Sequence, residues 1–380
     1  MVTSYHYLPL ARVVFGVPAA QAAAEEAARI GARKVFIVAS KSLSRKTAVI
    51  REIADALGLK YAGLFDECIA HTPWPSVIAA ADAVRAAEPD LILTVGGGTP
   101  IDTVKILQLV LAHGARVPDD LERLRAPELK ESKPSPVRQV AIPTTLSGAE
   151  FSNLGGGTDP RTRIKHSFTG ADIGPRAVIL DPVITLHTPE WLWLSTGIRG
   201  VDHAAEALCS VDAHPYCDGL ALHALRLFAD ALPRTQATPQ DIAARLLCQQ
   251  ASWLAASTIA RVNYGASHGM GHALGAAADV PHGHTSCIML PHVLRYNEPA
   301  TRDKERLISE ALGQPGSSAG DAVAKLVAAL GQPSTLRQAG VKREQLPAVA
   351  AASMQNRWVL ANPQPIRSEQ DVMRLLEAAW

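Results

Sequence analysis

Histidines carry the first sign of chemistry in this sequence of 380 residues. His268 and His272 are four positions apart, a spacing that places two imidazoles on one face of a helix. His282 follows soon after, and His203 lies upstream. Imidazole nitrogens bind metals and exchange protons near neutral pH. The i,i+4 pair alone favours ordinary surface or core residues, because a metal site needs several convergent ligands, but a third histidine within reach strengthens the case for a site.

A glycine-rich turn is the second feature. An apolar run at 91–95 predicts a buried strand, glycines 96–98 follow it, and Pro100 suits the first turn of a helix. Three glycines let a pyrophosphate approach the backbone closely, and the helix N-terminus attracts its charge. A plain strand-to-helix turn remains the alternative, because the pattern is neither the G-x-G-x-x-G fingerprint nor a P-loop.

A second turn, at residues 143–150, also follows a predicted strand. Thr144, Thr145 and Ser147 offer hydroxyls, and together with Gly148 they are typical of a helix cap that can also bind phosphate or ribose. Two such turns in one half of the chain favour nucleotide binding more than either alone.

The elements that must position these residues change character along the chain. Apolar runs predict strands at 35–38, 91–95, 140–142 and 177–180, and helical patterns fill 19–31, 47–57 and 76–87. A polar turn is expected at 40–42 and an exposed charged connection at 116–138. Strands that alternate with helices predict a parallel sheet covered on both faces. After residue 182 only helical patterns remain, so we predict an α/β domain at 1–183 and an all-helical domain at 184–380.

Composition narrows the class of protein. Lys+Arg total 37 and Asp+Glu 36, which argues against nucleic-acid binding. No apolar stretch reaches the ~18 residues of a membrane helix, and Arg12 interrupts the apolar start, which argues against a signal peptide. The five cysteines contain no C-x-x-C pair, as expected for reduced thiols. We expect a cytoplasmic protein without membrane or nucleic-acid partners.

Taken together, these motifs resemble the iron-containing (group III) alcohol dehydrogenase family over nearly the whole chain. The matching segments are 96–105, 143–150, 179–182, 203–206, 268–275, 281–283 and 290–292. The resemblance implies a Rossmann-like dinucleotide-binding domain, a helical domain, an active cleft between them, and a homodimer. It also implies direct hydride transfer between a nicotinamide and a carbonyl or alcohol carbon of a small-molecule substrate.

The resemblance assigns roles to individual residues. It implies a cofactor set of Gly97, Gly98, Thr99, Asp102, Thr144, Thr145, Ser147 and Lys165. His272 resembles the histidine beside the nicotinamide, and His203, His268 and His282 match the three histidine metal ligands. After the strand at 35–38, many family members carry an aspartate that binds the adenosine ribose. Here Ser40 and Lys41 occupy that region without an acid, so we expect both NADH and NADPH to bind.

One position departs from the family pattern. The fourth ligand, an aspartate four residues before the first ligand histidine, is Arg199 here. A guanidinium stays protonated and cannot coordinate a cation. Asp202 lies about 100° round the helix from His203 and is a poor substitute, whereas Glu206 lies about 60° from that face. We therefore expect that no catalytic metal is bound. The expected catalytic residues are Arg199, His203, His268, His272 and His282.

Three hypotheses follow. Maleylacetate reductases also lack that aspartate, so the first is a metal-independent NAD(P)H reductase of a small anionic oxo-acid, with Arg199 polarising a carbonyl or holding a carboxylate. The second is a metal-dependent alcohol dehydrogenase in which Glu206 or water completes the site. The third is a silent nucleotide-binding relative, against which the intact histidines argue. A different role for Arg199, a salt bridge with Asp202 or Glu206, remains open.

Overall fold

The computed structural model describes residues 5–162 and 164–380, which form two units. Residues His6–Thr188 make the sheet unit, and Pro189–Trp380, joined by Tyr5, make the helical unit. This division falls slightly later than the predicted boundary after residue 183. Ile184 packs into the core of the sheet unit, and the hydroxyl of Thr188 donates to the Thr144 carbonyl at 2.7 Å, so 184–188 remain with the sheet.

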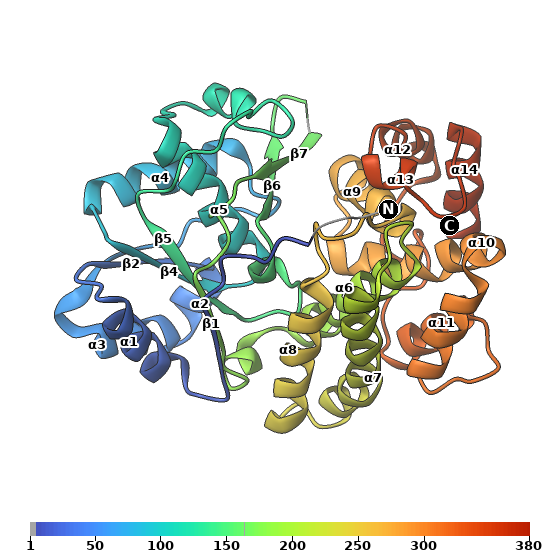
Figure 1. Cartoon of the computed structure of the whole chain (residues 1–380), viewed down its shortest axis with the longest axis horizontal. Helices are drawn as coiled ribbons and strands as arrows, with labels where there is room; N and C mark the ends of the chain where they lie inside the picture. The colour runs from blue at the N-terminus through green and yellow to red at the C-terminus, as the bar shows by residue number, and fades with distance from the viewer. Residues whose placement is uncertain (1–4, 163) are drawn as a thin grey trace. The chain divides into compact units, whose positions relative to one another are not determined.

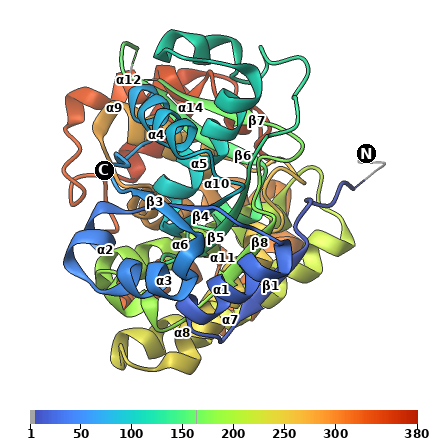
Figure 2. The ribbon, with the colours of Figure 1, turned by 90° about the vertical axis from the view of Figure 1, so that its left-hand side faces the viewer.

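A six-stranded parallel sheet forms the centre of the sheet unit. Its order is β1-β8-β5-β4-β2-β3, and Figure 2 shows β3, β4, β5, β8 and β1 in succession. The strands are β1 (Arg12–Phe15), β2 (Val35–Ala39), β3 (Tyr61–Phe65), β4 (Leu91–Gly96), β5 (Arg138–Pro143) and β8 (Ala177–Leu180). Because all six run parallel, their carboxyl ends meet at one edge, where ligands of such sheets bind.

Helices cover both faces of this sheet, as predicted (Figure 2). Val35 and Ile37 of β2 point into a core with α1 (Ala19–Ile30) and α3 (Val49–Leu57). Phe36 and Val38 point the other way, into a core with α4 (Trp74–Ala87) and α5 (Gly98–His113). Residues buried on both faces explain why these strands appear as continuous apolar runs in the sequence.

Several elements of the sheet unit were not predicted. A short helix, α2 (Lys41–Lys46), replaces the expected polar turn, and β1 and β3 lie at the two sheet edges. A separate antiparallel hairpin pairs β6 (Leu154–Asp159) with β7 (Ile164–Thr169). Glycines 155–157 lower the intrinsic strand preference of β6, so pairing with β7 rather than an apolar run defines it.

The helical unit confirms the predicted change to helices. Its helices are α6 (Glu190–Cys209), α7 (Pro215–Ala237), α8 (Ile242–Ala256), α9 (Ala266–Ala278), α10 (His282–Ala311), α11 (Ala319–Ala329), α12 (Leu346–Ser353), α13 (Arg357–Leu360) and α14 (Glu369–Ala378) (Figure 1). Short 3-10 turns are η1 (Gly58–Lys60), η2 (Pro118–Arg123), η3 (Ala149–Phe151), η4 (Ile184–His187) and η5 (Arg343–Gln345). Across the described residues, no helix is both long and apolar enough to cross a membrane.

Candidate functional site

The glycine turn after β4 is closely surrounded by the predicted cofactor residues. A Cβ on Gly97 would lie 3.0 Å from Cγ2 of Thr145, and one on Gly98 would lie 3.2 Å from Oγ of Ser147. On the other side, Ser40 Oγ is 3.3 Å from the Cβ position of Gly96. A side chain at Gly97 or Gly98 would therefore crowd these hydroxyl residues, and Gly96, with a φ of 149°, adopts a conformation that favours glycine.

The two predicted turns are joined directly. The backbone N–H of Thr144 donates to the Gly96 carbonyl at 3.0 Å, and Thr145 and Ser147 place their hydroxyl oxygens 3.3 Å apart. Gly148, with φ of 71°, caps only the 3-10 turn η3, so the predicted helix cap is a single turn. The parallel pairing of β4 with β5 brings both turns to the same sheet edge.

Helix α5 starts at Gly98, immediately after the turn, and continues for 16 residues. Its first turn contains Thr99 and Pro100, and proline suits this position because its missing N–H needs no partner there. The remaining N–H groups and the positive end of the helix dipole converge on an anion at the turn. The residues present therefore fit the pyrophosphate of a dinucleotide.

Asp102 and Lys165 meet at one glycine of the hairpin. Asp102 Oδ2 accepts the N–H of Gly156 at 3.1 Å, and the Cβ position of Gly156 is 3.0 Å from Nζ of Lys165. A side chain at position 156 would displace Lys165. The structure thus places two predicted cofactor residues, one on α5 and one on β7, next to each other.

Lys105, which the sequence analysis did not single out, anchors this arrangement. Its ammonium group is fully buried and donates to the Ala149 carbonyl, to the Leu154 carbonyl at 2.8 Å and to Ser152 Oγ at 3.1 Å. Burial lowers the pKa of Lys105, whereas nearby Asp102, 3.5 Å away, opposes that shift. Lys105 therefore fastens η3 and β6 to the helix that carries the glycine turn.

In the helical unit, one face of α6 carries four ionisable residues. Arg199, Asp202, His203 and Glu206 are spaced i, i+3, i+4 and i+7 and are all buried. Such a stripe is normally apolar, so these groups must find partners inside the unit. The spacing is visible in the sequence, from which we expected Asp202 to be a poor substitute for the missing metal ligand.

Glu206 finds its partners at the start of helix α9. Its carboxylate accepts the backbone N–H groups of Gly265 at 3.1 Å, Ser267 at 2.8 Å and His268 at 3.2 Å. It also accepts from His268 Nδ1 at 2.7 Å. These N–H groups are the ones that a helix N-terminus leaves without intrahelical partners, and a carboxylate there is stabilised by the helix dipole.

The two buried imidazoles form a relay with this carboxylate. His268 Nε2 lies 2.8 Å from His203 Nδ1. Because Nδ1 of His268 faces a carboxylate, we assign the proton to that nitrogen, so that Nε2 accepts the N–H of His203. Tyr264 packs against both rings, with centroids 5.5 Å from His203 and 4.5 Å from His268.

Arg199 reaches Asp202 through a serine. Arg199 Nη1 donates to Ser286 Oγ at 3.2 Å, and Ser286 donates to Asp202 Oδ2 at 2.6 Å. Within 5–162 and 164–380 no carboxylate oxygen lies within 4.0 Å of the guanidinium, so the direct salt bridge considered above is not formed. Burial lowers the pKa of Arg199 while Asp202 and Glu206 oppose the shift, and a guanidinium remains protonated.

The carboxyl of Asp202 is held ionised by its surroundings. Burial raises its pKa, but His268, Arg199 and the Ser286 hydrogen bond outweigh that effect and lower it below the usual value. Ser267 donates a further hydrogen bond to Asp202 Oδ2 at 2.8 Å. The buried cation Arg199 and the buried anion Asp202 are therefore coupled through the Ser286 hydroxyl rather than by direct contact.

His272 and His282 lie at the other end of the cluster. Their ring centroids are 5.8 Å apart, and His272 Nδ1 lies 3.3 Å from Asn356 Nδ2. Trp358 contacts both His268 and His272, at 5.8 and 5.0 Å, which confirms that these two share a helix face. No motif pointed to Asn356 or Trp358, since they cap and begin a short helix, α13, far along the chain.

The donor atoms do not fit the metal site that the resemblance implied. Among the described residues, the His, Cys, Asp and Glu donors that converge within 4.8 Å are those of Asp202, Glu206 and His268, without His203 and His282. The Glu206 carboxylate accepts N–H groups at the N-terminus of α9, and Nδ1 of His203 faces Nε2 of His268. The buried Arg199 adds a positive charge beside this group.

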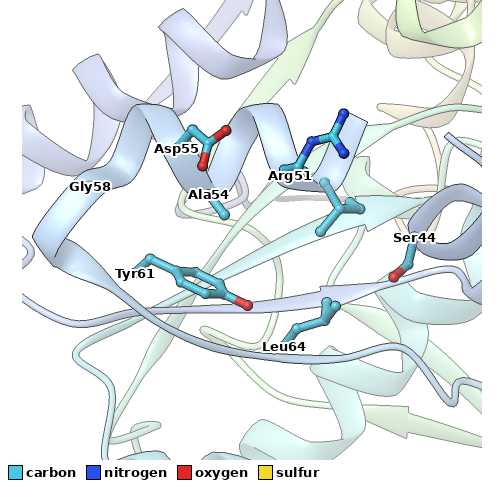
Figure 3. Close-up of a pocket in the computed structure, with 8 residues that line it drawn as sticks. Ser44, Arg51, Ala54, Asp55, Gly58, Tyr61 and Leu64 are labelled. Carbon is cyan, nitrogen blue, oxygen red and sulfur yellow. The ribbon is translucent and has the colours of Figure 1, made fainter. Parts of the chain in front are cut away.

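A separate cavity of about 600 Å³ lies in the sheet unit, between α3 and β3 (Figure 3). Arg51 and Asp55 of α3 and Tyr61 and Leu64 of β3 are among the residues that line it. None of the predicted cofactor or catalytic residues contributes to it, so we assign it no part in the reaction.

A dinucleotide-type turn on a parallel sheet and a buried histidine cluster in a helical unit define the class of nicotinamide-dependent oxidoreductases. The model for iron-containing alcohol dehydrogenase matches residues 10–182, and the model for the C-terminal part of the Fe-containing alcohol dehydrogenase family matches 193–380. The chain belongs to the iron-containing alcohol dehydrogenase family.

Individual relatives span at least nine-tenths of the chain. Dehydrogenase ALT3 of Alternaria alternata is 33% identical over 90% of this chain and 99% of its own length. Maleylacetate reductase 2 of Cupriavidus pinatubonensis is 31% identical over 99% and 96%. The crystal structure of maleylacetate reductase from Agrobacterium tumefaciens matches with a TM-score of 0.84 and 28% identity, covering 100% of this chain and 98% of that one. These similarities confirm the predicted fold, family and oxidoreductase class.

Proposed function

We propose that this protein reduces a small anionic oxo-acid with NADH or NADPH and needs no catalytic metal. The glycine turn, with Thr145 and Ser147 beside it, would hold the pyrophosphate, and Asp102 and Lys165 would bind toward the nicotinamide end. The similarity to maleylacetate reductases supports an oxo-acid substrate. By family resemblance the enzyme would act as a homodimer.

The observation that carries this proposal is the buried guanidinium of Arg199. It replaces the ligand aspartate of the family, its charge is not matched by a carboxylate in contact, and its Nη1 lies 3.6 Å from the Cβ position of Gly271, next to His272 on α9. A fixed cation there can stabilise an oxyanion or bind a substrate carboxylate.

The chemistry follows from this charge. Hydride from the nicotinamide adds to the carbonyl carbon, and the electron pair of the C=O bond moves onto oxygen, where Arg199 would stabilise it. The resulting alkoxide needs a proton, which His203, protonated on both nitrogens, would donate from Nε2; the neutral ring that remains keeps its Nδ1–H on His268. The relay through His268 to Glu206 would hold the His203 ring in the required orientation.

A metal-dependent alcohol dehydrogenase is the second candidate. Asp202, Glu206 and His268 place donor atoms within 4.8 Å of one another, which is the arrangement a divalent cation would need. For that function Glu206 would have to leave the N–H groups of α9 and the cation would lie close to Arg199.

Steady-state turnover of Arg199 variants distinguishes the two. Arg199→Ala should lower turnover on an oxo-acid by ~10²–10³, the usual loss when one preorganised charge at an oxyanion is removed. NADH affinity should stay within about twofold, which shows that the variant is folded. Arg199→Ala turnover equal to that of the wild type would reject the role of the guanidinium.

A further inference from the structure

Four charged side chains form an ion-pair network at the carboxyl edge of β2 and β3. Lys41 and Arg45 lie on one face of α2, four residues apart, and Asp66 and Glu67 directly follow β3. We call these four residues the edge network. It was not predicted, because the acids and the bases come from different segments of the chain.

Glu67 bridges both cations of the edge network. One carboxylate oxygen accepts from Lys41 Nζ at 2.8 Å, and the other pairs with Arg45 Nη2. Arg45 in turn forms a two-pronged contact with Asp66, with Nε at 2.9 Å and Nη2 at 3.1 Å from the two oxygens. Hydrogen bonds from these cations lower the pKa of both carboxyls, so both are ionised at neutral pH.

The edge network adjoins the glycine turn. Strands β2 and β3 are paired, with Val38 opposite Phe65, so the residues that follow them emerge side by side. Ser40, which immediately precedes Lys41, lies against Gly96 of the turn. In sheets of this type, the residues after the second strand recognise the adenosine ribose. By this rule, the segment that carries the two cations is the one that faces the ribose 2′ position.

The two acids differ in how firmly they are held. The Asp66 side chain is 15% exposed and takes the bidentate contact with Arg45. The Glu67 side chain is 52% exposed, and Lys41 and Arg45 are similarly open to solvent. An exposed ion pair contributes little and exchanges readily. Glu67, rather than Asp66, is the anion that an incoming phosphate can replace.

We propose that Glu67 is the residue that sets the choice between NADPH and NADH, acting as a built-in competitor for a 2′-phosphate site made by Lys41 and Arg45. This inference rests on nucleotide binding at the glycine turn. With NADPH, the 2′-phosphate takes the place of Glu67 on the two cations. With NADH, Glu67 stays on the cations and its carboxylate accepts the ribose 2′-hydroxyl.

The proposal predicts opposite changes in NADPH affinity for two variants. Glu67→Gln keeps the shape but removes the competing charge, so NADPH should bind about tenfold tighter. NADH should bind up to about threefold more weakly, because its 2′-hydroxyl keeps an acceptor oxygen but loses the charged one. Lys41→Gln removes a phosphate ligand, so NADPH should bind about tenfold more weakly, while NADH affinity should stay within about threefold of the wild type. Because a phosphate dianion is involved, the NADPH effect should shrink as salt is raised.

The test is fluorescence titration of each purified full-length variant with NADH and NADPH, together with ADP and 2′,5′-ADP to isolate the phosphate. Glu25→Gln is the matched control, because it makes the same charge change elsewhere in the sheet unit, on α1. Glu25 accepts a side-chain hydrogen bond from Gln21 at 2.8 Å and takes no part in the edge network. Glu25→Gln should leave the NADPH-to-NADH ratio as in the wild type.

Two outcomes would overturn the proposal while leaving nucleotide binding in place. One is an unchanged NADPH-to-NADH ratio in Glu67→Gln. The other is a Lys41→Gln variant that weakens NADH and NADPH equally. If the wild type binds neither dinucleotide, the proposed function itself fails, which is a different result and is seen before any variant is made.

Discussion

Replacing Glu206 by glutamine is the sharpest test of how the histidine cluster is built. The wild-type carboxylate is 4% exposed and accepts four N–H groups, three from the backbone of Gly265, Ser267 and His268 and one from the His268 ring. Glutamine has the same shape but only one acceptor oxygen. Its amide NH₂ would point at donors and leave some of them unsatisfied.

The expected cost follows from these contacts. A hydrogen bond to a charged group contributes about 1.5–3 kcal/mol, and a buried donor left unsatisfied costs about 1–3 kcal/mol. Because the four bonds share one carboxylate they are not additive, and we expect Glu206→Gln to lower the free energy of unfolding by about 3–5 kcal/mol in all. For a unit of this size that corresponds to a Tm lower by roughly 10 °C.

Thermal unfolding followed by circular dichroism measures this difference. Glu305→Gln is the control, because Glu305 is also a buried glutamate of the helical unit, 3% exposed, but accepts a single hydrogen bond, from Thr301 at 2.7 Å. Burial raises the pKa of Glu305 to about 7, so a neutral glutamine should cost less than about 1 kcal/mol. Equal losses in the two variants would refute the argument that Glu206 caps α9.

Three further predictions concern single residues. Gly97→Val should abolish NADH binding in a titration while the circular dichroism spectrum stays that of a folded chain, because the new side chain meets Thr145 at 3.0 Å and blocks the pyrophosphate; normal NADH binding would move the phosphate site elsewhere. Lys105→Met removes the ammonium that the Ala149 and Leu154 carbonyls share, and the single Ser152 hydroxyl can replace it at only one of them. NADH affinity should therefore fall about tenfold and unfolding should need about 2–4 kcal/mol less; wild-type values would show that Lys105 is dispensable. The pKa of Glu305 is raised to about 7, so the folded state binds more protons than the unfolded state between about pH 4.5 and 7. The stability of the wild type relative to Glu305→Gln should therefore fall as the pH rises from 5 to 8. A difference in Tm that does not change with pH would contradict this sign.

The sheet unit shows which strands can be predicted from the sequence and which cannot. Strands β2, β4, β5 and β8 are buried on both faces, so each contains a mainly apolar run that the sequence shows. The edge strand β3 is only half-buried, and the glycines of β6 carry no strand signal. These strands exist because a neighbour pairs with them, and pairing across the chain cannot be read from a local pattern.

The candidate site divides in the same way. The glycine turn is predictable because its chemistry depends on residues that are consecutive in the sequence. The partners of Glu206 are not, since they lie at the start of another helix, and the spacing of Arg199, Asp202 and Glu206 shows only that they share a face. Likewise, the pairing of Lys41 with Glu67 depends on the neighbouring positions of β2 and β3.

The central claim is that a fixed cation replaces the family's metal, and dialysis against a strong chelator tests it most directly. NADH-dependent turnover on an oxo-acid is measured before dialysis, after it, and after adding Fe²⁺ or Zn²⁺. If Arg199 supplies the charge, turnover should be the same in all three samples and the purified protein should contain far less than one metal ion per chain. Turnover that disappears on dialysis and returns with the metal would contradict the account and establish the metal-dependent dehydrogenase.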